Sequence, residues 1–273
     1  MSRPPVALSI AGSDPSGGAG IQADLKTFSA LGVYGTCVIT ALTAQSTVGV
    51  TGVHVVPAEF VTQQLETLVA DIQVDAIKIG MLANAGIIEA VGDFLRRHPQ
   101  DHVVLDPVMV ATSGDRLLDD DAIQAMRDLF PLASLITPNL AEAAALLETR
   151  PARTLADMRL QAMALQQLGA ARVLIKGGHL DDPESLDLLV DVDGQAVLRA
   201  IRVDTLNTHG TGCTLSSALA ALRPQRDSWL EAALDAKNWL TAALTAADAL
   251  AIGHGHGPVH HFHEIWSDGP RAL

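Results

Sequence analysis

The segment from Asn207 to Cys213, read Asn-Thr-His-Gly-Thr-Gly-Cys, has residue types that suit the binding of an anion. Leu215, Leu219 and Leu222 follow it at helical spacing, so the segment is predicted to begin a helix. Its two glycines allow a ligand to approach the backbone, and the first N–H groups of a helix have no intrahelical acceptor. Such donors suit phosphoryl transfer, because charge spreads over the transferring oxygens. A glycine-rich turn that only begins a helix is the alternative.

Cys213 is predicted to lie in the first turn of this helix, where the helix dipole lowers the pKa of a thiol. A catalytic or acceptor-contacting thiol is therefore one interpretation. A small buried hydrophobic side chain is the other, and it is the interpretation we give to Cys37 within an apolar strand. Two cysteines cannot form a disulfide framework, which favours a reducing compartment.

Two polar residues in the first half of the chain occupy unexpected positions. At about 100° per residue, Asp24 falls within the apolar stripe of its helix, near Phe28 and Leu31. A carboxylate there either pairs within the protein or accepts a hydrogen bond from a substrate hydroxyl. Gln45 follows a strand, and its amide offers a donor and an acceptor to the edge of a heteroaromatic ring. An exposed surface glutamine is the alternative.

A second polar group is predicted around the end of two later strands. Asn139 and Glu142 are three residues apart at the start of a helix, where one carboxylate can hold Mg²⁺ that keeps most of its waters. The helix dipole alone also favours a glutamate at that position. Lys176 ends a strand and can contribute positive charge to phosphates, with a solvated lysine as the alternative.

Short apolar runs alternate with helical patterns along most of the chain, which predicts a mostly parallel sheet covered on both faces. The predicted strands are Val6–Ala11, Thr36–Ala44, Ala76–Ile79, Val103–Asp106, Ser134–Ile136 and Arg172–Lys176. The predicted helices include Ala58–Ala70, Ala85–Arg97, Asp119–Leu129, Leu140–Glu148 and Thr154–Leu168. Ligands of such sheets collect at the carboxyl ends of strands. The segments that directly follow a predicted strand are Gly12–Gly20, Gln45, Gly80-Met81, Asp106-Pro107, Pro138-Asn139 and Gly177-Gly178.

The end of the chain is predicted to complete the same fold. Asp193-Gly194 lies between apolar runs and indicates a hairpin, which predicts an antiparallel edge. Ser228 and Glu231 indicate a capping box at the start of the last long helix. Because no linker or repeat interrupts the pattern, we expect one domain over residues 1–273.

Composition limits the classes of function. The 273 residues carry 18 Lys and Arg against 31 Asp and Glu, a net charge of −13 that disfavours binding to nucleic acid or to anionic membranes. The stretch from Thr27 to Ala58 has no charged residue, yet glycines and threonines interrupt it, so a membrane span is disfavoured. With no export signal visible, we expect a cytoplasmic protein.

Two other patterns are weaker evidence of a function, and one common nucleotide-binding motif is missing. Gly18, Gly20 and Ala23 match the dinucleotide fingerprint, but the spacing from the preceding strand is too long and no ribose-binding acid ends the next strand. The histidines from His254 to His263 suggest a metal site without a predictable ligand geometry, and a loop near the nucleotide is the alternative. The sequence has no Walker-type phosphate loop.

Taken together, six motifs resemble the hydroxymethylpyrimidine/phosphomethylpyrimidine kinases of thiamine biosynthesis, members of the ribokinase-like superfamily. These motifs are Ala11–Asp24, Lys78–Met81, Leu105–Met109, Thr137–Asn139 with Glu142, Lys176–His179 and Gly210–Cys213. The resemblance extends from about Val6 to His263. It implies a three-layer α/β ribokinase-like fold and an ATP- and Mg²⁺-dependent kinase. The implied substrates are 4-amino-5-hydroxymethyl-2-methylpyrimidine and its monophosphate, and a homodimer is expected.

The resemblance also assigns roles to individual residues. It places Gly12, Asp24, Gln45, Met81 and Val108 in the pyrimidine pocket. The anion hole is assigned to Gly210, Thr211, Gly212 and Cys213, and the nucleotide and Mg²⁺ site to Asp106, Asn139, Glu142 and Lys176. Sugar kinases of the superfamily have an aspartate base where this chain has Cys213. A thiol is a poorer base, so Cys213 is expected to position or partly deprotonate the hydroxymethyl group.

Two other functions remain open. A pyridoxal kinase is the nearest, because vitamin B6 also has a ring nitrogen and a hydroxymethyl group. A non-catalytic pyrimidine sensor is the other, although a ring pocket alone would need neither the anion hole nor Lys176 and Glu142.

Overall fold

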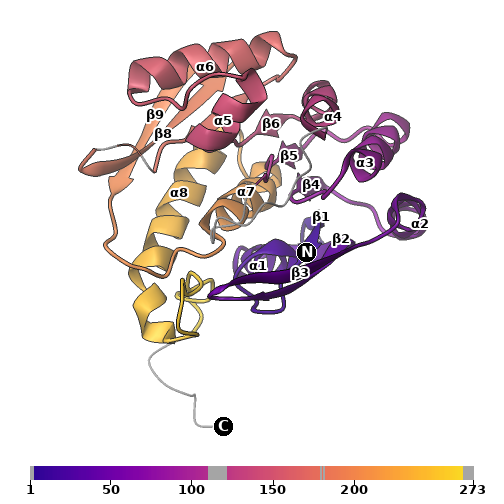
Figure 1. Ribbon diagram of the computed structural model, residues 1–273, viewed down its shortest axis with the longest axis horizontal. Coiled ribbons are helices and arrows are strands. Elements are labelled where there is room, and N and C mark those ends of the chain that lie inside the picture. The colour runs from indigo at the N-terminus through magenta and orange to yellow at the C-terminus, as the bar shows by residue number, and fades with distance from the viewer. Residues whose placement is uncertain (1–2, 110–121, 179, 181, 267–273) are drawn as a thin grey trace.

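A computed structural model describes residues 3–109, 122–178, 180 and 182–266 of the chain. Nine strands form one sheet in the order β3-β2-β1-β4-β5-β6-β7-β8-β9 (Figure 1). The strands are β1 Val6–Ser13, β2 Tyr34–Ser46, β3 Gly49–Val55, β4 Ala76–Ile79, β5 Val103–Leu105, β6 Leu135–Ile136, β7 Val173–Lys176, β8 Glu184–Asp191 and β9 Gly194–Ile201. The six neighbouring strands β2, β1, β4, β5, β6 and β7 are parallel, whereas β3, β8 and β9 pair antiparallel with their neighbours.

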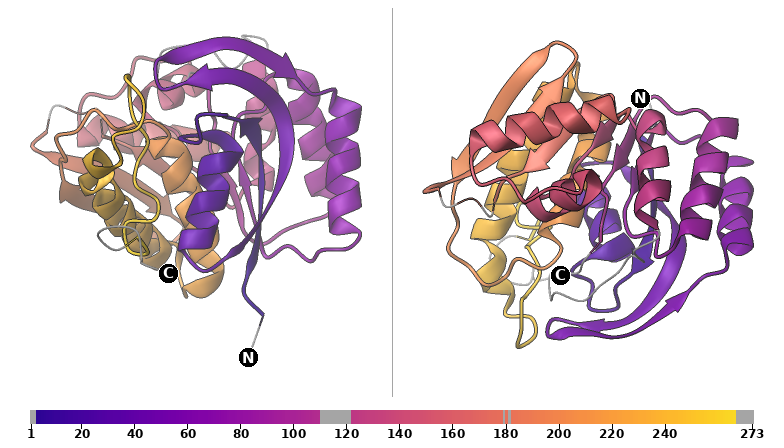
Figure 2. Two further views of the ribbon diagram at one scale, coloured as in Figure 1. Left: turned by 90° about the horizontal axis from the view of Figure 1, so that it is seen from below. Right: turned by 45° about the horizontal axis from the view of Figure 1, so that its top comes forward.

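Helices cover both faces of this sheet (Figures 1 and 2). The helices are α1 Gly20–Ala30, α2 Ala58–Val69, α3 Ala85–Arg97, α4 Ala122–Asp128, α5 Leu140–Leu147, α6 Leu155–Gln167, α7 Thr211–Leu222 and α8 Trp229–Thr245. One hydrophobic cluster joins the sheet to α2 through α6, and a second joins it to α1, α7 and α8. The predicted three-layer fold with an antiparallel edge is therefore confirmed.

The alternation of side chains along the central strands explains how polar groups reach the second layer. Leu8 and Ile10 of β1 point to the α2–α6 side, whereas Ala7 belongs to the α1, α7 and α8 cluster. On β4, Ile77 and Ile79 likewise pack on the first side. Because neighbouring residues of a strand face opposite sides, the intervening polar residues of β1 and β4 face α1 and α7.

The second antiparallel edge was not predicted. Strand β3 pairs with β2 to form a long curved hairpin (Figure 2). Thr51 and the next four residues of β3 are exposed, so the strand lacks the apolar character by which a buried strand is recognised. Strand β2 also extends beyond the predicted range, and Gln45 lies within it rather than after it.

Two helix starts differ from prediction. Helix α4 is described from Ala122, and the earlier part of the predicted helix, from Asp119, lies outside the described residues. At α8, Ser228 accepts a hydrogen bond from the backbone of Glu231 as predicted. The reciprocal half of the box is absent among these described residues, because the Glu231 carboxylate accepts instead from the Asp227 N–H at 3.1 Å.

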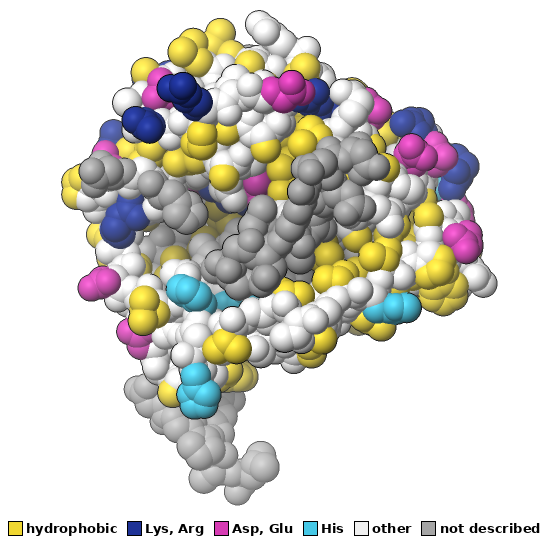
Figure 3. Space-filling view, in the orientation of Figure 1, with side chains coloured by type: hydrophobic (Ala, Val, Ile, Leu, Met, Phe, Trp, Pro, Cys, Tyr) yellow, Lys and Arg dark blue, Asp and Glu magenta, His cyan; other side chains and the backbone are white. Residues whose placement is uncertain are grey.

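The face of the molecule shown in Figure 3 carries charged side chains of both signs. These side chains lie mostly around the rim, and the two signs are interspersed. Among the described helices, none has the length and apolar character needed to cross a bilayer.

Candidate active site

The anion-binding segment lies where α7 begins. Gly210 occupies the N-cap with a φ of 75°, and an added Cβ would lie 1.8 Å from the Gly18 carbonyl oxygen. The two glycine-rich loops are therefore packed against each other, and no side chain larger than hydrogen fits at 210 without movement. An added Cβ on Gly212 would lie 3.2 Å from Lys176 Nζ. The Thr211 N–H donates to the Thr208 carbonyl at 3.2 Å, whereas the next N–H groups of the helix have no intrahelical acceptor. The start of α7 thus places backbone N–H groups near a lysine ammonium.

Lys176, at the end of β7, is surrounded by carboxylates. Its Nζ lies 2.7 Å from Asp106 Oδ1 and 3.8 Å from Glu142 Oε2. Burial by itself lowers the pKa of Lys176, but the charges of Asp106 and Glu142 outweigh burial and raise it. The Thr137 hydroxyl lies 3.3 Å from Asp106 and 2.8 Å from the hydroxyl of Ser216 on α7. These contacts connect the ends of β5, β6 and β7 with the anion-binding helix.

Asn139 and Glu142 form a capping box at the start of α5. The Asn139 side chain accepts from the N–H groups of Ala141 and Glu142 at 2.9 Å, and Glu142 Oε2 accepts from the Asn139 N–H at 2.8 Å. Glu142 is buried, which raises its pKa; Lys176 lowers it and Asp106 raises it, for a value of about 7. Two carboxyl groups therefore share one ammonium, an arrangement suited to a divalent cation that retains waters.

The turn that follows Lys176 is fixed from beneath by a buried ion pair. The Asp187 carboxylate accepts from the Gly177 N–H at 2.9 Å and lies 2.7 Å from Lys237 Nζ on α8. Both charged side chains are less than one-tenth exposed. We did not predict this pair, because 50 residues separate its members.

Gly12 and Met81, which the resemblance assigns to one wall of the pyrimidine pocket, lie side by side. An added Cβ on Gly12 would lie 3.0 Å from Met81 Sδ, and the Met81 carbonyl accepts from the Thr40 hydroxyl at 2.6 Å. Val108 is half-buried and packs against the hydrophobic cluster that contains Met81. Gln45, a polar residue assigned to the same pocket, is half-buried on β2.

His209 joins this wall to the anion-binding segment. Its Nε2 lies 2.8 Å from Asp14 Oδ2 and 3.4 Å from Gln45 Nε2, and the next residue is Gly210. Burial raises the pKa of Asp14, but hydrogen bonds from His209, Ser16 and Ala19 together lower it below its usual value. His209 and Asp14 both lie within segments discussed in the sequence analysis, but neither was predicted as a site residue. Only the fold shows that their side chains meet.

The predicted contact between Asp24 and the substrate is wrong, because groups of the protein itself bind both oxygens of its carboxylate. Asp24 and Lys78 are both fully buried, with Nζ 3.0 and 2.9 Å from the two carboxylate oxygens. The hydroxyls of Ser9 and Ser217 each donate to it at 2.6 Å. Direct contact with a substrate hydroxyl does not fit this geometry, and the paired structural aspartate that sequence analysis left open does.

The predicted electrostatics of Cys213 were also wrong. The helix dipole was expected to lower its pKa, but burial, the largest cause, raises it. Lys78 opposes burial and lowers the pKa, Asp106 and Asp24 raise it, and the Gly20 N–H has the smallest, lowering effect. The thiol therefore stays protonated at neutral pH in this structure. That state favours a positioning role over a base role for Cys213.

The histidines near the C-terminus are used in packing. His261 Nε2 lies 3.0 Å from the hydroxyl of Thr214 in the first turn of α7, and burial is the main cause that lowers the pKa of His261 to about 3. The His260 and Trp266 rings meet edge to face at 5.3 Å. In the described parts of the chain, no three His, Cys, Asp or Glu side chains form a metal-binding cluster.

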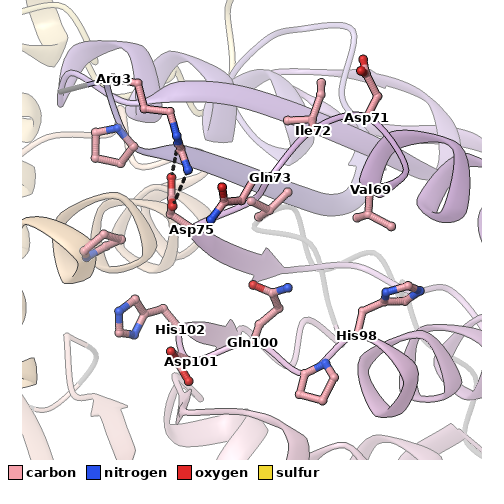
Figure 4. A pocket seen from close by; sticks show the side chains of 14 residues that line it. Arg3, Val69, Asp71, Ile72, Gln73, Asp75, His98, Gln100, Asp101 and His102 are labelled. Carbon is pink, nitrogen blue, oxygen red and sulfur yellow. Dashed lines mark hydrogen bonds and ion pairs between the residues drawn. The ribbon is translucent and has the colours of Figure 1, made fainter. Parts of the chain in front are cut away.

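A separate cavity of about 800 Å³ lies at the opposite end of the strands. Arg3 and Asp75, which form an ion pair at 2.6 Å, line one side, and His98, Gln100 and His102 line the other (Figure 4). None of the residues predicted for catalysis or binding lines this cavity.

Known proteins that resemble this chain are kinases, in keeping with the anion-binding geometry at the start of α7. The family model described as phosphomethylpyrimidine kinase matches residues 14–260. The chain is 58% identical over 261 residues to the hydroxymethylpyrimidine/phosphomethylpyrimidine kinase of Salmonella typhimurium strain LT2, covering 95% of this chain and 98% of that protein.

Two solved structures resemble the chain over most of its length. An ADP complex of Bacillus subtilis pyridoxal kinase has a TM-score of 0.88 and 37% identity, covering 96% of this chain and 99% of that one. A phosphomethylpyrimidine kinase from Clostridium difficile has a TM-score of 0.78 and 40% identity, covering 88% and 99%. The chain belongs to the phosphomethylpyrimidine kinase family, within the ribokinase-like fold.

Proposed function

We propose that the chain transfers phosphoryl groups from ATP to 4-amino-5-hydroxymethyl-2-methylpyrimidine and then to the resulting monophosphate, within thiamine biosynthesis. The observation that carries the proposal is the position of the α7 start. On one side, His209 contacts Gln45, and on the other, Gly212 lies beside Lys176. A ring held at Gln45 and a nucleotide held at Lys176 would therefore meet at Gly210–Cys213.

The protein's own groups can perform most of this transfer by placement and charge. The acceptor oxygen would attack the γ-phosphorus in line as the bond to the ADP oxygen breaks. Backbone N–H groups of Gly210, Gly212 and Cys213 would hold the transferring oxygens, and Lys176 would bind the nucleotide phosphates. The Thr211 N–H donates to the Thr208 carbonyl at 3.2 Å and would join them only by leaving that acceptor. Mg²⁺, when bound with the nucleotide, neutralises phosphate charge. Glu142 would hold that ion, partly through water, with Asp106 and Asn139 beside it.

The two steps make different demands on Cys213. A hydroxymethyl group must lose a proton during transfer, and the phosphoryl group that it receives can take up this proton directly or pass it to water. A phosphate monoester, by contrast, is already ionised near neutral pH. We propose that Cys213 positions the hydroxymethyl oxygen in the first step, in keeping with its raised pKa. Gln45 would bind the polar edge of the ring, with Gly12, Met81 and Val108 along its faces.

A pyridoxal kinase is the second candidate, favoured by the likeness to the Bacillus subtilis enzyme. The experiment that separates the two is ³¹P NMR of purified protein with Mg-ATP and each acceptor. We expect a pyrimidine monophosphate and then a diphosphate. Transfer to pyridoxal alone would contradict the proposal. Pyrimidine binding without any transfer would support the sensor.

We also propose that the chain acts as a homodimer in the cytoplasm. Both cysteines, Cys37 and Cys213, are free thiols, in keeping with a reducing compartment. Sedimentation velocity should give a mass of twice 28.6 kDa, and a single 28.6 kDa species would contradict the dimer.

A further inference from the structure

The Nε2 atom of His209 lies close to both Asp14 and Gln45, but it cannot donate a hydrogen bond to one and accept a hydrogen bond from the other. A ring nitrogen that lies 2.8 Å from a carboxylate oxygen carries its hydrogen, so Nε2 donates to Asp14. The same Nε2 then has no lone pair for Gln45 Nε2, which lies 3.4 Å away and is itself a donor. Two donors therefore face each other at this contact.

Thr43 shows a second conflict with the same amide. Its one hydroxyl hydrogen has two acceptors, the Ser13 carbonyl at 2.9 Å and Gln45 Oε1 at 3.1 Å. A half-turn of the Gln45 amide exchanges its oxygen and nitrogen, which removes the facing donors and gives the Thr43 hydrogen a single acceptor. The His209 N–H then lies 2.8 Å from Asp14 as its main acceptor and 3.4 Å from Gln45 as a second, weaker one. Gln45 Nε2 then donates to Thr43 Oγ1, whose hydrogen stays on Ser13, and Gln45 Oε1 faces the His209 N–H.

We propose that Thr43 and His209 are positioning residues that hold the Gln45 amide in this one orientation and so select the 4-amino edge of the pyrimidine. The amide keeps one N–H and one oxygen lone pair for a ligand. A 4-aminopyrimidine edge offers a ring-nitrogen acceptor beside an amino donor, which an amide can bind at two points. A 4-oxo ring offers the opposite pattern. This inference rests on the proposed function.

The surroundings of His209 make the orientation rigid. The His209 side chain is 7% exposed, and its partner Asp14 is held by the N–H groups of Ser16 and Ala19 at 2.8 Å. An added Cβ on Gly18 would lie 2.3 Å from His209 Cδ2, so the imidazole fills the space that this glycine leaves. Because the next residue is Gly210, ring selection and the anion hole share one backbone segment.

The test compares two acceptors, the 4-amino carbinol and its 4-oxo analogue, in wild type and four variants. Thr43→Val removes the hydroxyl with little change of volume, and Thr43→Ser restores it. Thr36→Val is the matched control, because Thr36 is on the same strand and its hydroxyl bonds only to Ala7 O, at 3.1 Å. The measurements are kcat/KM for each acceptor and, by calorimetry without nucleotide, Kd.

In wild type and in the Thr43→Ser and Thr36→Val variants, we expect the same preference for the amino ring. In Thr43→Val the preference should fall about tenfold in both kcat/KM and Kd, within the range that one two-point amide contact discriminates. A second variant, His209→Gln, should lower it as well, since a glutamine amide can face Gln45 with either atom.

Two results have distinct meanings. If Thr43→Val keeps the preference of the Thr36→Val control, the positioning role is wrong even though the enzyme turns over. If wild type binds the amino ring in calorimetry but transfers no phosphoryl group, the proposed function is wrong, and the binding preferences still decide the role of Thr43 and His209.

Discussion

The buried pair Asp24–Lys78 is the sharpest test of how the site is held. Lys78→Met would leave the Asp24 carboxylate with only the hydroxyls of Ser9 and Ser217, at a position with no exposed surface. Removal of one partner from a buried ion pair costs about 3–5 kcal/mol, because an uncompensated charge remains. Since whole domains are stable by roughly 5–15 kcal/mol, this variant should lose a large part of its free energy of unfolding.

Asp24→Asn should cost a similar amount, because it leaves the Lys78 ammonium facing a neutral amide. The double variant has neither charge, and the amide introduced at position 24 can still bond to both serines. Its cost should therefore fall short of the sum of the single costs by about 3 kcal/mol or more. Urea unfolding followed by the fluorescence of the three tryptophans measures all three values.

A parallel cycle on Asp93 and Arg96 is the control. This pair is joined at 2.6 Å, but its side chains are 64% and 53% exposed, so its coupling should stay below about 1 kcal/mol. Additive costs for Asp24 and Lys78, equal to the control within error, would refute the view that Asp24 is a paired structural carboxylate.

Three further predictions concern the chemistry. Glu142 has a pKa of about 7, above the usual 4.5, so its negative charge develops only as the pH rises through 7. The apparent affinity for Mg²⁺, measured in activity titrations, should therefore rise from pH 6 to 7.5 and then level off. The Glu142→Gln variant should not show that rise. Gly210→Ala should lower kcat by about 100-fold in steady-state assays, because its Cβ would meet Gly18, and near-normal kcat would contradict a fixed anion hole. Cys213→Ser should slow phosphorylation of the carbinol about 100-fold more than that of the monophosphate in single-turnover assays, and equal effects would remove Cys213 from the first step.

The central sheet was predictable because its strands are short apolar runs bounded by turns and joined by helical patterns. Strand β3 was not predictable, because Val53 and Val55 are exposed and glycines interrupt the strand. Its sequence therefore lacks the apolar pattern of a strand with a buried face. Strand β3 forms because it pairs with β2, and such pairing between strands cannot be predicted from the local pattern of residue types alone.

The site was predictable as a set of loops at the carboxyl ends of strands, but the partners within it were not. Asp24 was recognised as a carboxylate on an apolar stripe, yet its partners lie 54 and 193 residues away. The pKa of Cys213 was predicted from the helix dipole alone, and burial near Asp106 outweighs that effect. His209 acquires its role only when the fold brings Asp14 and Gln45 to it.

The most direct test of the central claim is a crystal structure with the pyrimidine carbinol and a non-hydrolysable ATP analogue bound together. The account predicts the γ-phosphate on the N–H groups of Gly210–Cys213, the carbinol oxygen beside it, and the amino edge of the ring on Gln45. A ring bound away from Gln45, or a γ-phosphate away from the start of α7, would contradict it.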